Sequence, residues 1–126
     1  MKTVTFLGCG SWGGALGKLL SEKGLGVTMW HRNLDVVNHL KDAKTHYLIP
    51  ELIFPSDVEF TNDISSAIQS SKIIVLALPS QSIRDVITKN KSSFNKNHII
   101  VNVSKGIEVD TLMTVSEVIN DALDGC

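Results

Sequence analysis

The sequence predicts an α/β fold, a doubly wound parallel sheet covered by helices on both faces, in a single domain of residues 1–126. Short apolar runs alternate along the chain with amphipathic stretches of helical spacing. The apolar runs are too continuous for an antiparallel sheet with one wet face, and a glycine-rich segment joins the first run to the first amphipathic stretch. Right-handed crossovers between successive strands then predict the strand order 3-2-1-4-5.

Five apolar runs are predicted as strands because they are rich in β-branched and aromatic residues and nearly free of charge. "KIIVLALP" at 72–79 is the clearest of them, since six apolar residues follow one another before a proline closes the run. Such continuity is typical of a strand that is buried on both faces. The predicted strands are 3–8, 26–30, 58–61, 72–79 and 98–104.

Helices are predicted where apolar residues recur at helical spacing. The first of them ends at Gly24, whereas Asn33 and Asp63 have side chains suited to cap the two helices that follow. Residues 44–57, which contain two prolines, are predicted to be irregular. The predicted helices are 11–23, 34–40, 64–70, 82–90 and 112–123.

The composition excludes several classes of function. A net charge of −1 gives no reason to expect a nucleic-acid partner or an affinity for a charged membrane surface. No apolar run reaches the roughly 18 residues of a membrane span, and no residue spacing is typical of a metal site. Cys9 and Cys126 do not form a disulfide framework, so we expect a reducing, cytoplasmic setting. Cys9 is interpreted as a small residue in a tight turn, with a reactive thiol as the alternative.

The glycine-rich segment "GCGSWGG" places Gly8, Gly10 and Gly13 in the pattern G-x-G-x-x-G, between a predicted strand and a predicted helix. The first glycine allows a sharp turn, the second lets a pyrophosphate approach the backbone, and the third lets the helix pack close to the strand. Gly14 and Gly17 lie inside the helix and are interpreted as positions of close packing. The segment predicts a dinucleotide-binding site, with a purely structural glycine turn as the alternative.

The end of the second predicted strand bears on the choice of dinucleotide. It reads Trp30-His31-Arg32-Asn33, where NAD-selective sites usually offer a carboxylate to the ribose 2′-hydroxyl, and the next carboxylate is Asp35. An arginine at this place suits the 2′-phosphate of NADP, which an acid would repel. The sequence therefore predicts NADP as the preferred cofactor over NAD, with a solvated surface position for Arg32 as the alternative.

Two further strand ends border the expected cleft. "LPSQS" at 78–82 ends the fourth strand and "VSKGIE" at 103–108 ends the fifth, and ligands of such sheets bind beyond the carboxyl ends of the strands. Lys105, followed by Gly106, suits an anionic group of a substrate. Simple solvation at the surface is the alternative for this lysine.

Taken together, these motifs resemble the N-terminal domain of bacterial NAD(P)-dependent glycerol-3-phosphate dehydrogenase, over nearly the whole chain. "GCGSWGGAL" is similar to that family's G-x-G-S-W-G-T-A-L, and "VTMWHR" to its V-x-x-W-x-R. "HYLIPELIFP" resembles its tyrosine-leucine-proline loop, and "TNDISSAI" resembles its T-x-D-x-x-x-A segment. "LPSQSIRDV" and "VSKGIE" are similar to its P-S-Q and S-K-G-I-E signatures. The set is far more specific than the glycine motif alone.

The resemblance implies a Rossmann-like domain of an enzyme that reduces dihydroxyacetone phosphate to sn-glycerol 3-phosphate with NADPH or NADH, for phospholipid precursor synthesis. It implies that Lys105 touches both the nucleotide and the substrate, and we expect the enzyme to be a homodimer. Together with the glycine motif, it places the cofactor site at Gly8, Gly10, Ser11, Trp12, Gly13, His31, Arg32, Tyr47, Pro79 and Lys105.

The chain also departs from the family's pattern. The general acid/base lysine, the later strands and an all-helical C-terminal domain are expected beyond residue 126, so no catalytic residue is expected within this chain, which is interpreted as the nucleotide-binding half. Cys9 and Gly14 replace an alanine and a threonine, and the loop 47–55 is one residue longer. The scattered histidines are interpreted as surface or packing residues, not proton donors: His31, His39, His46 and His98.

Two other functions stay open. One is another two-domain NADP-dependent reductase, such as a 3-hydroxyacyl or ketopantoate reductase. The other is a non-catalytic module that binds NAD(P)H and signals by oligomerising. In the chain as interpreted here, the strand that would cover 98–104 is expected beyond Cys126, so 98–104 is expected to form a bare sheet edge. Two chains are then expected to associate by pairing these edges or by exchanging the last helix.

Overall fold

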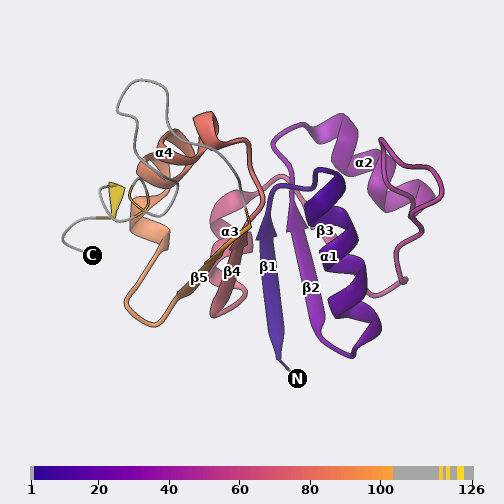
Figure 1. The fold of residues 1–126 in the computed structure, drawn as a ribbon, viewed down its shortest axis with the longest axis horizontal. Helices are drawn as coiled ribbons and strands as arrows, with labels where there is room; N and C mark the ends of the chain where they lie inside the picture. Colours follow the sequence, from indigo (N-terminus) through magenta and orange to yellow (C-terminus); the bar gives the residue numbers. More distant parts are fainter. Residues whose placement is uncertain (1, 104–116, 118, 120–121, 124–126) are drawn as a thin grey trace.

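A computed structural model describes residues 2–103, 117, 119 and 122–123, which form a sheet flanked by helices (Figure 1). The sheet has five strands, all parallel, in the order β3-β2-β1-β4-β5, which confirms the predicted fold class and strand order. The elements are β1 (Thr3–Leu7), α1 (Ser11–Glu22), β2 (Gly26–Trp30), α2 (Leu34–Ala43), β3 (Glu59–Thr61), α3 (Ile64–Gln69), β4 (Ile73–Leu76), α4 (Ser80–Lys89), the short 3-10 helix η1 (Lys91–Ser93) and β5 (Ile99–Asn102).

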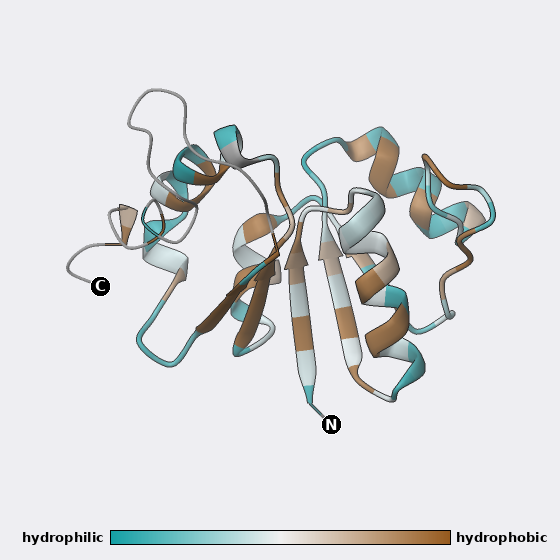
Figure 2. Cartoon of the chain, viewed as in Figure 1, coloured by the Kyte–Doolittle hydropathy of each residue, from teal (hydrophilic) through white to brown (hydrophobic). Residues whose placement is uncertain are grey.

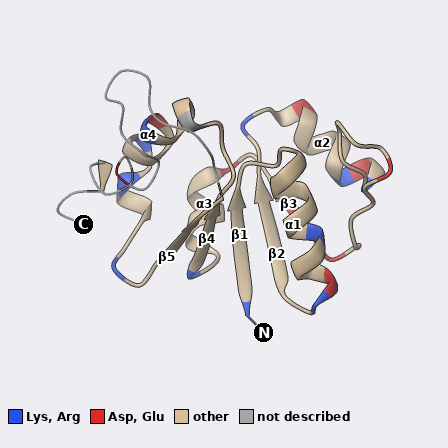
Figure 3. Cartoon of the chain, viewed as in Figure 1, with Lys and Arg blue, Asp and Glu red and all other residues tan. Residues whose placement is uncertain are grey.

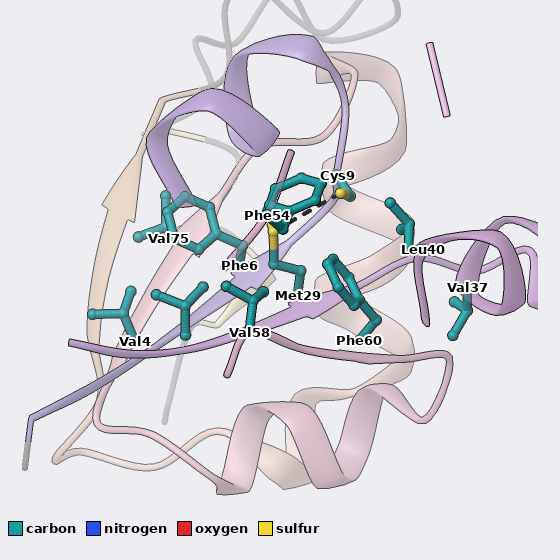
Figure 4. Packing of buried hydrophobic residues seen from close by; sticks show 11 residues of the cluster. Val4, Phe6, Cys9, Met29, Val37, Leu40, Phe54, Val58, Phe60 and Val75 are labelled. Atoms are coloured by element: carbon teal, nitrogen blue, oxygen red, sulfur yellow. Dashed lines mark hydrogen bonds between the residues drawn. The ribbon is translucent and has the colours of Figure 1, made fainter. Parts of the chain in front are cut away.

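The register of the central strands sorts their side chains onto two faces. Phe6 of β1 lies level with Met29 of β2 and Val75 of β4, and all three belong to the core under α1 and α2 (Figure 4). The next residue of β1, Leu7, and the residues level with it in β2 and β4 belong to the core under α3 and α4. Because side chains alternate along a strand, one parallel sheet buries both of its faces. Figure 2 shows the consequence in β4 and β5, which are hydrophobic along most of their length.

Local signals explain where the helices begin. Asn33 caps α2 by accepting hydrogen bonds from the Asp35 and Val36 amides at 2.9 and 3.4 Å, and Asp63 caps α3 through the Ser66 amide at 3.2 Å, as the sequence predicts. In contrast, α1 begins after Gly10 with no side-chain cap. The amide groups of its first turn are therefore left for another partner.

The fourth predicted strand and its helix have boundaries that differ from the structure. β4 ends at Leu76 and not at residue 79, and α4 begins at Ser80 and not at 82. The Ala77 amide still donates to the Leu7 carbonyl at 3.0 Å, but Pro79 has no N–H for a ladder and instead starts the turn into the helix. The apolar run continues past the strand because its last residues line a cleft.

The remaining predictions concern the chain ends and the irregular stretch. Residues 44–57 are irregular as predicted, apart from an isolated antiparallel bridge between Thr45 and Ile53. The predicted helix 112–123 lies mostly outside the described residues, although Ile119, Ala122 and Leu123 pack against the core under α3 and α4.

Figure 3 shows that charged residues lie mainly on the helices and connections and seldom on the strands. Within the described residues, no helix has both the length and the hydrophobicity needed to cross a bilayer.

Candidate nucleotide-binding site

The glycine-rich loop lies where β1 ends and is packed against the chain that leaves β4. Gly8 has φ +107°, and a Cβ there would overlap the Ala77 carbonyl. A Cβ on Gly13 would lie 2.8 Å from the Ala77 Cβ, so this glycine allows α1 to approach the sheet. Gly10 differs from both, because a Cβ there would meet no atom within 4 Å. Packing therefore accounts for two of these glycines, while Gly10 leaves one side of the loop open to a ligand.

Two more glycines inside α1 are in close contact with other parts of the fold. A Cβ on Gly17 would lie 3.0 Å from the Met29 Cε of β2, so this position packs the helix onto the sheet. A Cβ on Gly14 would lie 2.6 Å from the His46 Cδ2. The close packing predicted for both positions is confirmed, but at Gly14 the partner is a loop histidine and not a strand.

A cleft crosses the carboxyl ends of β1, β2 and β4. Its first hollow, with a volume of about 220 Å³, is lined by Gly8, Gly10, His31, Arg32, Tyr47 and Pro79 among others. A second hollow is lined by Ser11, Trp12, Gly13 and Val103, and it shares Gly10 and Ala77–Pro79 with the first. The two hollows therefore meet at the glycine-rich loop. All the predicted cofactor residues lie here except Lys105, which is outside the described residues.

The N-terminus of α1 makes the meeting point attractive to anions. Neither a side-chain cap nor an acidic residue occupies its first turn. The first amides and the helix dipole therefore act on whatever enters the cleft beside Gly10. Trp12, in the same turn, has 61% of its surface exposed, which is unusual for an indole and offers a flat apolar face at the second hollow.

The outer wall of the first hollow consists of Tyr47, His31 and Arg32. The Tyr47 and His31 rings meet edge to face with centroids 5.4 Å apart, and His31 Nδ1 accepts a hydrogen bond from the Asn33 amide at 3.0 Å. Burial and the neighbouring Arg32 charge lower the pKa of His31, and burial raises the pKa of Tyr47. Both rings are therefore uncharged near neutral pH. Since none of the described lining residues is acidic, Arg32 sets the sign of charge on this wall.

His46 is the site-forming residue that the sequence analysis missed. Its side chain is 1% exposed, its Nδ1 accepts from the Leu48 and Ile49 amides at 3.0 and 3.3 Å, and its Nε2 lies 2.9 Å from the Cys9 carbonyl oxygen. The ring also stacks on Tyr47 with centroids 4.7 Å apart. The packing role expected for His46 is confirmed, but its contact with the glycine-rich loop was not predicted. The only sequence signal was the adjacent Tyr47.

Cys9 anchors the glycine-rich loop from below. Its side chain is 1% exposed, and its Sγ lies 3.9 Å from the Met29 Sδ (Figure 4). Burial raises the pKa of the Cys9 thiol to about 12. This supports a small packing residue over a reactive thiol. The described residues contain no group of three or more histidines, cysteines or carboxylates that could hold a metal ion.

Known proteins resemble this chain in sequence and fold. A sequence model described as the N-terminus of NAD-dependent glycerol-3-phosphate dehydrogenase matches residues 3–125. The chain belongs to this family. The glycerol-3-phosphate dehydrogenase (NAD(P)+) of Anaeromyxobacter sp. strain K is 38% identical over 121 residues, which are 95% of this chain and 36% of that protein. The enzyme of the same name from Clostridium perfringens strain SM101 is 39% identical over 124 residues, 98% of this chain and 38% of that protein.

Solved structures agree with this assignment. The crystal structure of glycerol-3-phosphate dehydrogenase from Coxiella burnetii superposes with a TM-score of 0.89 at 26% identity, covering 97% of this chain and 38% of that one. A diketoreductase structure reaches 0.68 at 15% identity, which shows a shared fold alone. The resemblance seen in the sequence is thus confirmed, and the other reductase families are not supported. The chain spans less than two-fifths of the length of the curated relatives named here.

Proposed function

We propose that this chain is the nucleotide-binding half of an enzyme that reduces dihydroxyacetone phosphate to sn-glycerol 3-phosphate with NADPH or NADH. The observation that carries the proposal is the cleft at the carboxyl ends of the strands, which joins an open glycine loop, an uncapped helix N-terminus and an aromatic wall. Such clefts are the ligand-binding places of doubly wound sheets. The family match supports a nucleotide as the ligand.

The residues present fit a dinucleotide. The open side of Gly10 and the first amides of α1 would receive the diphosphate, with the Ser11 hydroxyl as a further donor. One hollow on each side of this point would receive one nucleoside. The wall of Tyr47, His31 and Arg32 would hold the adenosine side, and Arg32 would pair with a 2′-phosphate, which favours NADP over NAD. Trp12 and Val103 would border the nicotinamide side.

The chemistry assigns a limited part to this chain. The reduced nicotinamide, when bound, supplies the hydride to the carbonyl carbon of the ketone, while a general acid must deliver a proton to the carbonyl oxygen. Lys105 is proposed to hold the substrate phosphate beside the nucleotide, and the acid/base lysine is proposed to lie in a further helical domain. The described residues would bind the cofactor and orient it. We also propose a cytoplasmic setting and a place in phospholipid precursor synthesis.

Titration with NADPH and NADH tests the proposal. The chain is expected to change cofactor fluorescence saturably, with NADPH binding more tightly than NADH. Absence of saturable binding for either cofactor would refute a nucleotide-binding half. A longer protein carrying this domain is expected to oxidise NADPH only when dihydroxyacetone phosphate is added. Binding of NADPH without any such turnover would favour the non-catalytic sensing module.

A further inference from the structure

We propose that His46 is a positioning residue that sets the direction of the glycine-rich loop's amide toward the nucleotide diphosphate. The proposal rests on the nucleotide site proposed above. His46 itself does not line either hollow of the cleft. It lies behind the loop, and acts through the Cys9–Gly10 peptide.

The hydrogen bonds of His46 define its tautomer. Nδ1 accepts from two backbone amides, those of Leu48 and Ile49, so Nδ1 must carry the lone pair. The proton is then on Nε2, which donates to the Cys9 carbonyl at 2.9 Å. One ring therefore fastens the turn at 46–49 to the glycine-rich loop, across 37 positions of sequence.

The bond to the Cys9 carbonyl fixes a complete peptide plane. In a planar trans peptide, the C=O and the N–H point to opposite sides. With the Cys9 carbonyl directed at His46, the Gly10 N–H is directed away from His46. A Cβ on Gly10 would meet no atom within 4 Å, and Gly10 lines both hollows. A diphosphate bound there would meet an amide that is already oriented, so less orientational entropy is lost on binding.

The imidazole ring is itself held in place. Its edge packs against Gly14, where any Cβ would lie 2.6 Å from Cδ2, and its face stacks on Tyr47. Loop, helix and aromatic wall therefore meet at one buried ring. The Cys9 side chain, packed on Met29, holds the other side of the same loop.

Two substitutions test the hydrogen-bond donor of His46 independently of its hydrogen-bond acceptor. In His46→Gln, the amide nitrogen can reach the place of Nε2 and still donate to the Cys9 carbonyl. In His46→Asn, the amide oxygen can replace Nδ1 as an acceptor for the backbone amides two and three residues on, but nothing reaches Cys9. The proposal requires that the glutamine variant retains nucleotide binding and that the asparagine variant does not.

His98 provides a matched control. Its Nδ1 accepts from the Asn95 amide at 3.0 Å and its Nε2 lies 3.0 Å from the Ile68 carbonyl oxygen, so it also ties a turn to a distant backbone carbonyl. His98 directly precedes β5 and so lies at the amino ends of the strands, whereas the cleft lies at their carboxyl ends. His98→Asn and His98→Gln therefore report the loss of such a tie without any effect on the nucleotide site.

The experiment compares NADPH with adenosine 2′-monophosphate, which lacks the diphosphate, by titration calorimetry on all four variants and the unmodified chain. His46→Asn is expected to weaken NADPH about tenfold, the size of one hydrogen bond, and the monophosphate less than about twofold. His46→Gln is expected to stay within about threefold for both ligands, and the His98 variants to leave both unchanged. The proposal would be overturned if His46→Asn lost equal affinity for the two ligands. It would also be overturned if His46→Asn and His46→Gln lost equal affinity for NADPH. Failure of the unmodified chain to bind NADPH would instead refute the proposed function.

A second measurement does not depend on the variants' folding. In the unmodified chain, the His46 Nε2 proton is expected to be visible and slowly exchanging by NMR, both before and after NADPH is added. The Gly10 amide resonance is expected to shift at saturation. A Gly10 amide that NADPH leaves unmoved, or a His46 ring protonated on Nδ1 alone, would overturn the proposal.

Discussion

Replacing Gly14 by alanine tests how tightly the loop around His46 is packed against α1. The new Cβ would lie 2.6 Å from the His46 Cδ2, 3.0 Å from its Nε2 and 3.4 Å from the Leu52 Cδ2. Carbon atoms pack at about 3.5–4.0 Å, so the ring must move by about 1 Å. That movement stretches the bonds to the Cys9 carbonyl and the Leu48 amide.

Gly14→Ala has effects of opposite sign on stability. Alanine favours a helix interior over glycine by about 1 kcal/mol. Overpacking costs about 1–3 kcal/mol, and each buried hydrogen bond that is lost adds about 1 kcal/mol. We therefore expect Gly14→Ala to lower the free energy of unfolding by about 1–3 kcal/mol. Urea unfolding followed by tryptophan fluorescence measures this change.

Gly17→Ala is the matched control on the same helix. Its Cβ would meet the Met29 Cε and Sδ, both at 3.0 Å, and these atoms belong to an unbranched, adaptable side chain. The helix-propensity gain is the same, so we expect Gly17→Ala to stay within about 1 kcal/mol of the original stability. In a His46→Ala background, Gly14→Ala should become neutral or stabilising, since the obstructing ring is gone. If the two alanine variants prove equally stable, His46 yields easily and the reasoning about a rigid ring is wrong.

Four further predictions concern the cofactor, the thiol, catalysis and association. Arg32→Ala should weaken NADPH binding by about 1.5–3 kcal/mol and leave NADH nearly unchanged in parallel titrations, whereas equal losses would show that Arg32 does not contact the 2′-phosphate. In a Cys126→Ser variant, Cys9 should react with a disulfide reagent at pH 8 only after denaturation, because burial raises the pKa of Cys9 to about 12 and leaves the thiol protonated. Rapid reaction of the folded chain would contradict this expectation. The 126-residue chain alone should bind NADPH yet show no dihydroxyacetone phosphate-dependent oxidation in a steady-state assay, and a rate near that of a longer relative would place the proton donor within this chain. Light scattering over a dilution series should show self-association through β5, one of the two edge strands of the described sheet, where Ile99 and Val101 are 51% and 41% exposed, and Ile99→Lys should reduce this association. A strict monomer at high concentration would exclude that edge as an interface.

The sequence by itself determined the sheet, its strand order and most helix boundaries. These features depend on local signals: the periodicity of apolar residues, the caps at Asn33 and Asp63, and the right-handed crossover. Gly8 and Gly13 were also recognisable, since a strand, a glycine turn and a helix are adjacent in sequence. The end of β4 was misplaced because apolar residues line the cleft as well as the core, and a hydrophobic pattern does not distinguish the two.

The tertiary structure alone decided what holds the cleft in shape. His46 lies in an irregular loop with no periodicity to interpret, and its partner carbonyl is 37 positions away. The reason for glycine at position 14 is likewise a ring from a distant segment, which no local pattern contains. The open side of Gly10 could be distinguished from the packed sides of Gly8 and Gly13 only once their neighbours were in place. Local signals select secondary structure, whereas long-range packing determines which backbone groups face a ligand, and only folding brings those groups together.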